Sequence, residues 1–379
     1  MTSGILDRKW ETSLRDLSSR TMKGTTSVRY CREPDFFQGL SYLGDQTQVV
    51  GTWDNLKVLA YAVRSQKKVW FRGAKKVFGS LGNLRLDPDY KSGMAMARGY
   101  LALRAVHNQD PLPGYLVTIV EGNIPAHKVL RKKRPLLPEY LPWGKYYTLI
   151  YPVKTKNTVT NMGNSGLRWC SDLTNPTLKE KKIFINQLPD LHARAGQFRE
   201  FYPVYDPQTF ESGYLSTLGK PGTEKDSCWV WLLKDDHLVA AACVWNQQKS
   251  KQIIIEKYPP ILQMLLSGVN LLFALVGWPK LPSSGELLNC ASLSCWAVED
   301  NDPESFKTLL EYSLKVSRLM GIDFLMAGFH EKDIFLTISQ EKKHLEYLSD
   351  IYLALWDEKN KDDLSWDGEK TAYLELGTL

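Results

Sequence analysis

The part of this chain best suited to binding a phosphate is a strand-like run with a short polar loop after it. The loop continues into a long apolar helix. The run covers residues 77–86, and the loop contains Lys91, Ser92, Gly93, Met94 and Ala95. Amides at the start of a helix, together with the helix dipole, attract phosphate groups. Gly93 and Ala95 let a ligand approach the backbone closely, and Lys91 adds positive charge. Because no side chain here resembles a nucleophile, we expect a binding site for a phosphorylated cofactor that itself carries the chemistry.

A second unit later in the chain has the same order of elements but a different loop. Residues 81–109 match residues 293–321 element for element, and the later loop is Glu299-Asp300-Asn301-Asp302-Pro303-Glu304. Its four carboxylates would repel a diphosphate, and its proline removes one amide. A strand–turn–helix unit with one glycine is common without any ligand, so this contrast is what favours a phosphate site in the first copy. We predict that the second copy is a scaffold or helps to bind an acceptor.

Length and repetition predict two comparable domains. The chain has 379 residues, of which 43% are apolar and 24% are charged, as in ordinary globular proteins. Both halves contain a hairpin pattern followed by strand, loop, helix, strand, short helix and strand. We predict an N-terminal domain over residues 1–153 that binds the cofactor and catalyses, a polar linker over 154–180, and a C-terminal domain over 181–379.

Composition excludes several other classes of protein. A net charge of +6 is mild, so we predict no nucleic-acid partner. The six cysteines have no metal-ligand or C-x-x-C spacing, and we expect no metal but buried, reduced thiols of a cytoplasmic protein. Residues 1–23 are expected to form a charged helix and lack the apolar core of a secretory signal. The most apolar segment, 258–281, is broken by prolines and polar residues, which favours a packed helix over a membrane span.

A basic run follows the next strand. Tyr115–Val120 is the predicted strand, and Asn123 is positioned to cap a helix whose first turn contains Pro125. That helix ends in Arg131-Lys132-Lys133-Arg134. This run is either a solvated helix end that complements the dipole or a patch for a terminal phosphate.

With these elements in this order, the chain resembles the GNAT superfamily of acyl-CoA-dependent N-acetyltransferases, and more specifically a bacterial tandem-GNAT protein with one degenerate copy. The resemblance rests on Leu84–Gly99 and Gly122–Lys132 and covers most of the chain by topology. The family's loop has a basic residue or Gln, two further residues, Gly, one residue, then Gly or Ala. Here, Gly93 and Ala95 at the small positions put Tyr90 at the basic one. Placing Lys91 there puts the two methionines at the small positions.

The resemblance implies the fold class α/β (α+β), with two GNAT-like domains, each a mixed, mostly antiparallel sheet flanked by helices with a splayed central strand pair. It implies acetyl-CoA or another acyl-CoA as co-substrate, whose pantetheine arm pairs with the strand edge between the splayed strands. The acyl group would pass directly to a primary amine, on a small molecule or a peptide, within a ternary complex. The implied cofactor-binding residues are Leu84, Arg85, Leu86, Lys91, Ser92, Gly93, Met94, Ala95, Met96, Asn123, Ala126 and Lys132.

The resemblance also directs attention to proton transfer. The family often has a tyrosine seven residues after the capping Asn, and this chain has Leu130 there. Substitutes would be water or a tyrosine on a neighbouring strand, and Glu121 could orient a water that deprotonates the amine or could simply be a solvated strand end. We expect His107 and His127 on helix surfaces. The candidate catalytic groups are Glu121, Tyr146, Tyr115 and, through a nearby backbone N–H that would stabilise the oxyanion, Leu86.

Two other functions stay open on the sequence alone. The missing tyrosine and irregular loop favour a non-catalytic acyl-CoA-binding or interaction protein. The apolar segment 258–281 would fit a long-chain enzyme similar to GNAT-like N-acyl amino acid synthases, in which it walls an acyl tunnel. A homo-oligomer is compatible with either function, and nothing in the sequence identifies the acceptor.

Overall fold

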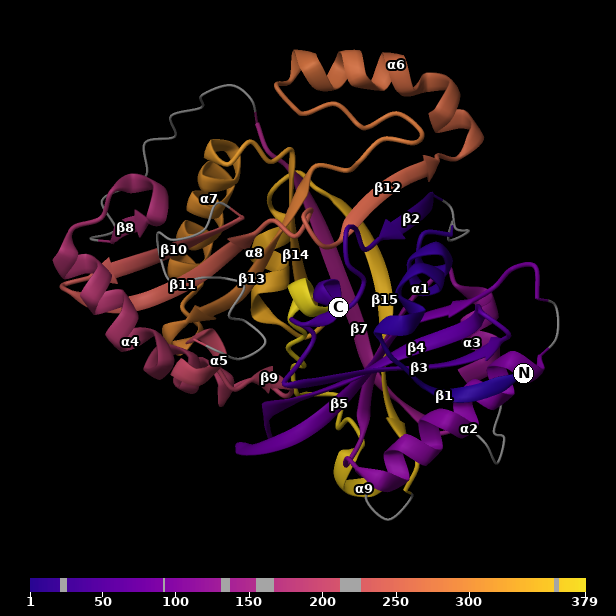
Figure 1. Ribbon diagram of the computed structural model, residues 1–379. Coiled ribbons are helices and arrows are strands. Elements are labelled where there is room, and N and C mark those ends of the chain that lie inside the picture. The colour runs from indigo at the N-terminus through magenta and orange to yellow at the C-terminus, as the bar shows by residue number, and fades with distance from the viewer. Residues whose placement is uncertain (21–25, 91–92, 131–136, 155–166, 212–225, 358–360) are drawn as a thin grey trace.

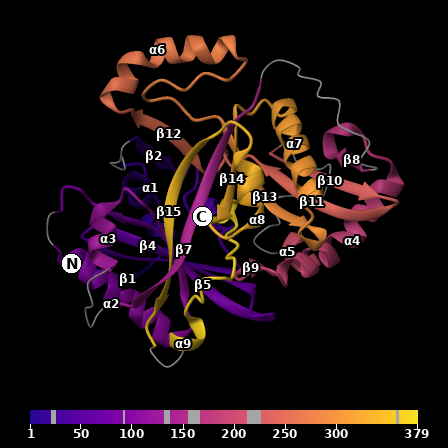
Figure 2. The same ribbon diagram turned by 180° about the vertical axis from the view of Figure 1, so that it is seen from behind.

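The computed structural model describes the whole chain except residues 21–25, 91–92, 131–136, 155–166, 212–225 and 358–360. Within this described part, one mixed sheet of thirteen strands runs through the molecule, and a separate two-stranded sheet joins β2 to β12. The large sheet has the order β1-β3-β4-β5-β6-β15-β7-β14-β13-β11-β10-β8, with β9 paired to β4. Figure 1 and Figure 2 show helices on both faces of this sheet.

The elements have the following bounds. The strands are β1 (Thr2–Leu6), β2 (Ser27–Cys31), β3 (Gln46–Asp54), β4 (Lys57–Phe71), β5 (Ala74–Leu86), β6 (Tyr115–Val120), β7 (Glu139–Pro152), β8 (Arg168–Ser171), β9 (Tyr202–Pro203), β10 (Ser227–Lys234), β11 (His237–Trp245), β12 (Gln252–Lys257), β13 (Cys290–Val298), β14 (Phe324–His330) and β15 (Leu345–Leu355). The α-helices are α1 (Glu11–Ser18), α2 (Met94–Gln109), α3 (Ile124–Leu130), α4 (Leu178–Gly196), α5 (Pro207–Glu211), α6 (Pro260–Leu275), α7 (Pro303–Leu319), α8 (Ile334–Gln340) and α9 (Lys361–Leu364).

The predicted hairpin in the first half is confirmed. β3 and β4 pair antiparallel down to Asp54↔Lys57, and Asn55 in the turn has a left-handed φ of +49°, which Asn adopts at low cost. Successive side chains of β4 point to opposite faces of the sheet. Val63 packs in the core cluster that contains α1 residues, and Ala62 in the cluster that contains α2 residues. The helices α1 and α2 therefore cover opposite faces of the first half.

Each half contains a pair of parallel strands that separate after a short contact. β5 and β6 pair only at Gly79↔Tyr115 and Ser80↔Leu116. A Cβ on Gly79 would lie 2.2 Å from the Tyr115 ring, so this close approach requires glycine. In the second half, β13 and β14 pair only from Cys290↔Phe324 to Ser292↔Met326. The expected fold class, with its splayed central strands, is confirmed.

The two halves exchange their last strands. β15, from the second half, lies between β6 and β7 and pairs antiparallel with both. β7, from the first half, lies between β15 and β14. Each half is thus completed by a strand of the other, and one sheet crosses the junction. The domain boundaries at residues 153 and 181 stay a prediction.

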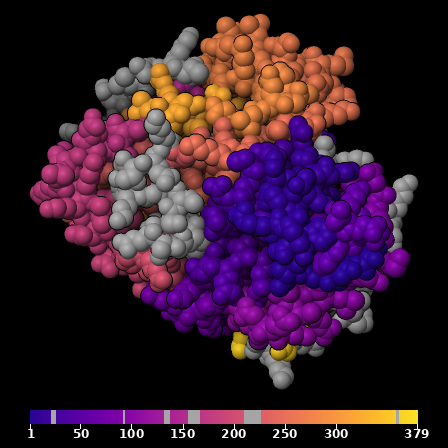
Figure 3. All heavy atoms as spheres, viewed as in Figure 1, coloured from indigo at the N-terminus to yellow at the C-terminus, as the bar shows by residue number. Residues whose placement is uncertain are grey.

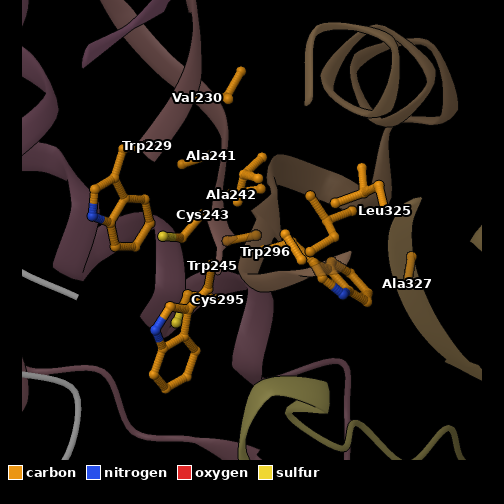
Figure 4. Close-up of a cluster of buried hydrophobic side chains, with 14 of the residues drawn as sticks. Trp229, Val230, Ala241, Ala242, Cys243, Trp245, Cys295, Trp296, Leu325 and Ala327 are labelled. Carbon is orange, nitrogen blue, oxygen red and sulfur yellow. The ribbon is translucent and has the colours of Figure 1, made fainter. Parts of the chain in front are cut away.

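The core of the second half is built from strands that are apolar along their whole length. α4 and α7 both pack on β11, and nearly every residue of β10, β11 and β13 is buried. Strands covered on both faces become continuous apolar runs rather than alternating ones. Figure 4 shows Trp229, Cys243 and Trp296 among the side chains of this core. All six cysteines are buried and free of disulfides, as the sequence predicts.

Several predicted elements are wrong. Part of the expected N-terminal helix is strand β1, which pairs with β3, and residues 168–171 of the expected linker form the edge strand β8. Residues 371–376, expected to close the sheet, make only a single bridge, Glu200↔Ala372. α6 was expected to be packed, yet it has no buried residue. Edge pairing and burial depend on distant neighbours, which periodicity along the chain does not report. Among the described residues, no helix is both long and apolar enough to span a membrane.

Candidate functional site

The start of α2 is an open helix N-terminus. Gly93 is the N-cap, no side chain caps it, and the first turn contains no acidic residue. A Cβ at Gly93 would meet no atom of the described residues within 4 Å. The Met94 side chain is 59% exposed, and Met96 packs against the core beneath α2. The described residues therefore leave an uncrowded surface at the start of α2, as an anion site requires.

A backbone irregularity lies in β5 next to this helix. The register between β4 and β5 shifts between Tyr61 and Val63, and Asn83 in the shifted segment has φ of +53°. The Asn83 Oδ1 atom accepts a hydrogen bond from Arg32 Nη2 at 3.1 Å. Such bulges turn backbone groups away from the regular ladder. Leu86, which is predicted to lie near the oxyanion donor, is three residues after Asn83. There the regular pairing has resumed, and Leu86 lies opposite Ala60.

The edge of β5 that faces β6 is available beyond the contact at Ser80. Within the described part of the chain, no strand pairs with this edge over residues 81–86. Leu84 and Leu86 are 51% and 43% exposed. Arg85 lies over the Tyr30 ring of β2, with its guanidinium carbon 5.9 Å from the ring centroid. An extended ligand could add to this edge as a further strand would.

We call the two parallel strands β5 and β6, which separate after their contact at Gly79 and Ser80, the first fork; β13 and β14 form the second fork. The predicted residues at the start of α3 follow β6 at the open end of the first fork. Asn123 Oδ1 accepts a hydrogen bond from the Ala126 N–H at 3.3 Å, which confirms the predicted cap. β5 and β6 run parallel, so the starts of α2 and α3 lie at the same end of the splayed pair. Lys91, Ser92 and Lys132 lie outside the described residues.

The corresponding positions in the second copy are occupied by carboxylates of the chain itself. Cys295, with φ of +50°, corresponds to Asn83, and its N–H donates to Glu375 Oε2 at 2.7 Å. Asp302 caps α7 by accepting a hydrogen bond from the Ser305 N–H at 2.9 Å. Glu299 forms an ion pair with Arg194, and its Oε2 atom lies 2.9 Å from His237 Nε2. The second copy therefore has the same fork with its anion-binding amides already satisfied.

A buried polar cluster lies between the second fork and the closed end of the first, where β5 contacts β6 at Gly79 and Ser80. The Glu375 carboxylate also accepts hydrogen bonds from the Tyr205 and Tyr373 hydroxyls, at 2.8 and 2.9 Å. Lys67 Nζ donates to Thr378 Oγ1 at 2.8 Å, and burial lowers the pKa of Lys67 to about 8. A cavity of about 20 Å³ between these groups is also lined by Gly79 and Ser80. Sequence reasoning missed this cluster because its members come from distant segments without a shared motif.

The two predicted catalytic tyrosines are buried with their hydroxyl groups bonded. The Tyr115 hydroxyl lies 3.2 Å from Arg64 Nε and 2.9 Å from His107 Nδ1, and the Tyr146 hydroxyl donates to the Leu374 carbonyl at 2.8 Å. Burial raises the pKa of both phenols. Glu121 is different: it is exposed directly after β6, and its carboxylate pairs with Lys145 Nζ at 2.7 Å.

The two histidines expected on helix surfaces are buried, so that expectation is wrong. His107 stacks on Trp356 with ring centroids 5.1 Å apart and shares its Nδ1 with the Tyr115 hydroxyl. His127 lies with Nε2 3.3 Å from the Val120 carbonyl and 3.6 Å from the Asp350 carboxylate. Both residues are on the helix side that faces the sheet, where aromatic and polar groups of β6 and β15 provide partners.

The fold has counterparts of known structure. No protein-family model matches the chain, and no curated protein does. N-myristoyltransferase of Saccharomyces cerevisiae with bound myristoyl-CoA is similar with a TM-score of 0.50 and 11% identity, over 93% of this chain and 88% of that one. A second structure of the yeast enzyme gives 0.50 and 12%, over 93% and 84%. A probable N-acyltransferase from Enterococcus faecalis V583 gives 0.49 and 10%, over 92% and 71%. At such identities the likeness to the yeast enzyme establishes a shared mixed α/β fold and no more.

Proposed function

We propose that this chain is an acyl-CoA-dependent N-acyltransferase whose active copy is the first half. The observation that carries the proposal is the contrast between the two forks. In the first, the described residues leave the helix N-terminus at Gly93 and the β5 edge open; in the second, Glu375 and Asp302 accept hydrogen bonds from backbone amides at the corresponding places. The myristoyl-CoA bound by the yeast enzyme supports an acyl-CoA donor for the same fold.

Each open feature has a role in this proposal. The backbone at the start of α2 holds the diphosphate, to whose binding Lys91 and Ser92 contribute, and Lys132 binds the 3′-phosphate. The pantetheine arm adds to the β5 edge at Leu84–Leu86, which Asn123 and Ala126 flank from the start of α3. The bulge at Asn83, between Ser80 and Leu86, directs a backbone N–H toward the thioester oxygen, where negative charge develops.

Proton transfer completes the reaction. The amine nitrogen attacks the thioester carbon, the C–S bond breaks, and the thiolate of CoA leaves. Glu121, the one predicted catalytic side chain that is exposed at the fork, orients the water that takes the proton from the amine. Tyr115 and Tyr146 would deliver a proton to the thiolate only by giving up their present bonds, so a positioning role suits them better.

Two measurements on the full chain test the proposal. Titration with CoA, acetyl-CoA and myristoyl-CoA should raise the melting temperature, because a ligand that binds only the folded state stabilises it. Release of free CoA from the acyl-CoA that binds best, in the presence of a panel of primary amines, should then depend on the amine. Absence of any stabilisation at saturating ligand would refute the site. Binding without amine-dependent release would instead identify a non-catalytic acyl-CoA-binding protein.

A further inference from the structure

The helix α6 lies apart from the rest of the molecule. It belongs to a projecting segment, residues 252–284, that we call the arm. β12 pairs with β2 rather than with the large sheet, and α6 follows directly. Figure 1 and Figure 2 both show α6 at the margin of the molecule, and Figure 3 shows the orange lobe that contains it projecting from the surface. No residue of α6 is buried, although the helix consists almost entirely of apolar residues. A contiguous apolar surface of this kind marks a site of interaction.

The large apolar side chains that are exposed lie on one side of the helix. Successive residues of an α-helix are separated by about 100° around its axis. This spacing places the most exposed large side chains within one half of the helix circumference. They form what we call the apolar face of α6: Ile261, Met264, Leu265, Leu271, Leu272 and Leu275.

The other side of α6 is held by the segment that follows it. The Asn270 side chain makes two hydrogen bonds with the backbone of Leu281, at 3.0 and 2.8 Å. Gln263 bonds to Ser284, and Phe273 packs edge-on against Trp278. The side chains of Gln263 and Asn270 thus fix the return segment of the helix. The arm is a built unit that presents the apolar face outward.

Charge indicates what covers this face. No acidic or basic residue occurs between residues 258 and 279, whereas the exposed Lys257 and Lys280 lie at the two ends of this segment. Protein interfaces usually include hydrogen-bonding groups as well as apolar ones. An apolar surface flanked by lysines suits a bilayer instead, since the side chains enter the acyl region and the ammonium groups meet lipid phosphates.

We propose that α6 docks this protein onto a lipid bilayer with anionic headgroups. The helix lies in the interface and does not cross, because its 16 residues extend over only about 24 Å, less than the hydrocarbon core. The arm connects to the first fork, since Arg32, directly after β2, donates a hydrogen bond to Asn83. This inference stands on the surface of α6 alone and does not require the proposed acyltransferase activity.

Binding to vesicles tests the proposal directly. The full chain should co-sediment with vesicles of phosphatidylcholine and phosphatidylglycerol, and several-fold less with phosphatidylcholine alone. The double variant Leu271→Glu, Leu275→Glu should bind at least about tenfold more weakly, because two inserted side chains are lost and two negative charges are added. Leu56→Glu is the matched control: Leu56 is 89% exposed in the β3–β4 turn, so this variant should bind as the wild type does. Equal binding by the double variant and the wild type, or no binding by the wild type, would overturn the proposal.

A probe on the helix distinguishes a bilayer from a second copy of the chain. All six native cysteines are buried, so Met264→Cys, at a position 85% exposed, introduces a thiol that an environment-sensitive dye can label selectively. Its emission should shift to the blue on addition of anionic vesicles, whereas dye at Leu56→Cys should not respond. A blue shift without lipid that grows with protein concentration, together with a doubled mass in sedimentation, would show that a second copy covers the face and would refute docking to lipid.

Discussion

Exchanging the capping residues of the two equivalent helices provides the sharpest test of which fork binds the diphosphate. The substitution Gly93→Asp gives α2 the cap that α7 has, and Asp302→Gly gives α7 the cap that α2 has. Gly93 has φ of −63° and open space where a Cβ would lie, so aspartate fits without strain. An acidic residue at a helix N-terminus also interacts favourably with the dipole. We therefore expect the Gly93→Asp protein to melt at or slightly above the wild-type temperature.

The effect on binding follows from charge. A carboxylate about 5 Å from a diphosphate with two negative charges repels it by about 2 kcal/mol in a water-like dielectric and by more in a lower one. Because Gly93 is exposed, the lower figure applies, and CoA should bind roughly 30-fold more weakly. Asp302→Gly removes the cap on Ser305, which costs a few tenths of a kcal/mol of stability, and should leave CoA affinity unchanged.

Isothermal titration of both variants with CoA at low and moderate salt measures this difference. The loss in Gly93→Asp should shrink as salt increases, since exposed charges are screened. Unchanged affinity in Gly93→Asp would show that the α2 N-terminus does not hold the diphosphate. Weaker binding in Asp302→Gly, or a second binding site in that variant, would show that the assignment of open and closed copies is reversed or incomplete.

Three further predictions concern the buried groups. The pKa of Lys67 is lowered by burial from 10.5 to about 8, so the folded state holds fewer protons than the unfolded state between these pH values. The stability of the wild type relative to Lys67→Met should therefore rise from pH 8 to 10.5, by up to about 3 kcal/mol, in urea unfolding at several pH values. Glu375→Gln should lose about 2 kcal/mol or more in the same assay, because an amide NH₂ would face the donors that the carboxylate accepts from. The six buried thiols should not react with Ellman's reagent in the native protein and should all react in denaturant, since burial raises the pKa of Cys170, Cys228 and Cys290 to about 12.

Elements set by local chemistry could be predicted from the sequence, and their partners could not. The turn at Asp54-Asn55 fixes the β3–β4 hairpin, and the bounds of β6, Tyr115–Val120, are those predicted. No local sequence pattern indicates that β7 and β15 are exchanged between the halves. An apolar strand in a covered sheet presents two similar edges, so its periodicity indicates a strand without indicating its neighbours.

The candidate site was predictable to the same degree. Gly93 and Asn123 occur in recognisable loop and cap motifs, and Asn123 caps its helix as predicted. Gly82-Asn83 within a strand is also a sequence signal of a bulge, and Asn83 has a left-handed φ of +53°. The equivalent Cys295 has neither glycine nor asparagine beside it, so its left-handed backbone depends on tertiary contacts, and Glu375 comes from a distant segment.

The closed fork gives independent support for the chemistry proposed for the open one. At Cys295 the bulged strand presents an N–H that binds a carboxylate oxygen at 2.7 Å, in a buried site. A buried amide N–H that donates to a carboxylate oxygen is suited to bind an oxygen with negative charge. Asn83 occupies the matching position, with φ of +53° against +50°, but on a strand edge that the described part of the chain leaves without a strand partner. The same backbone shape would therefore stabilise the oxyanion of a thioester in the first fork, while Glu375 takes that place in the second.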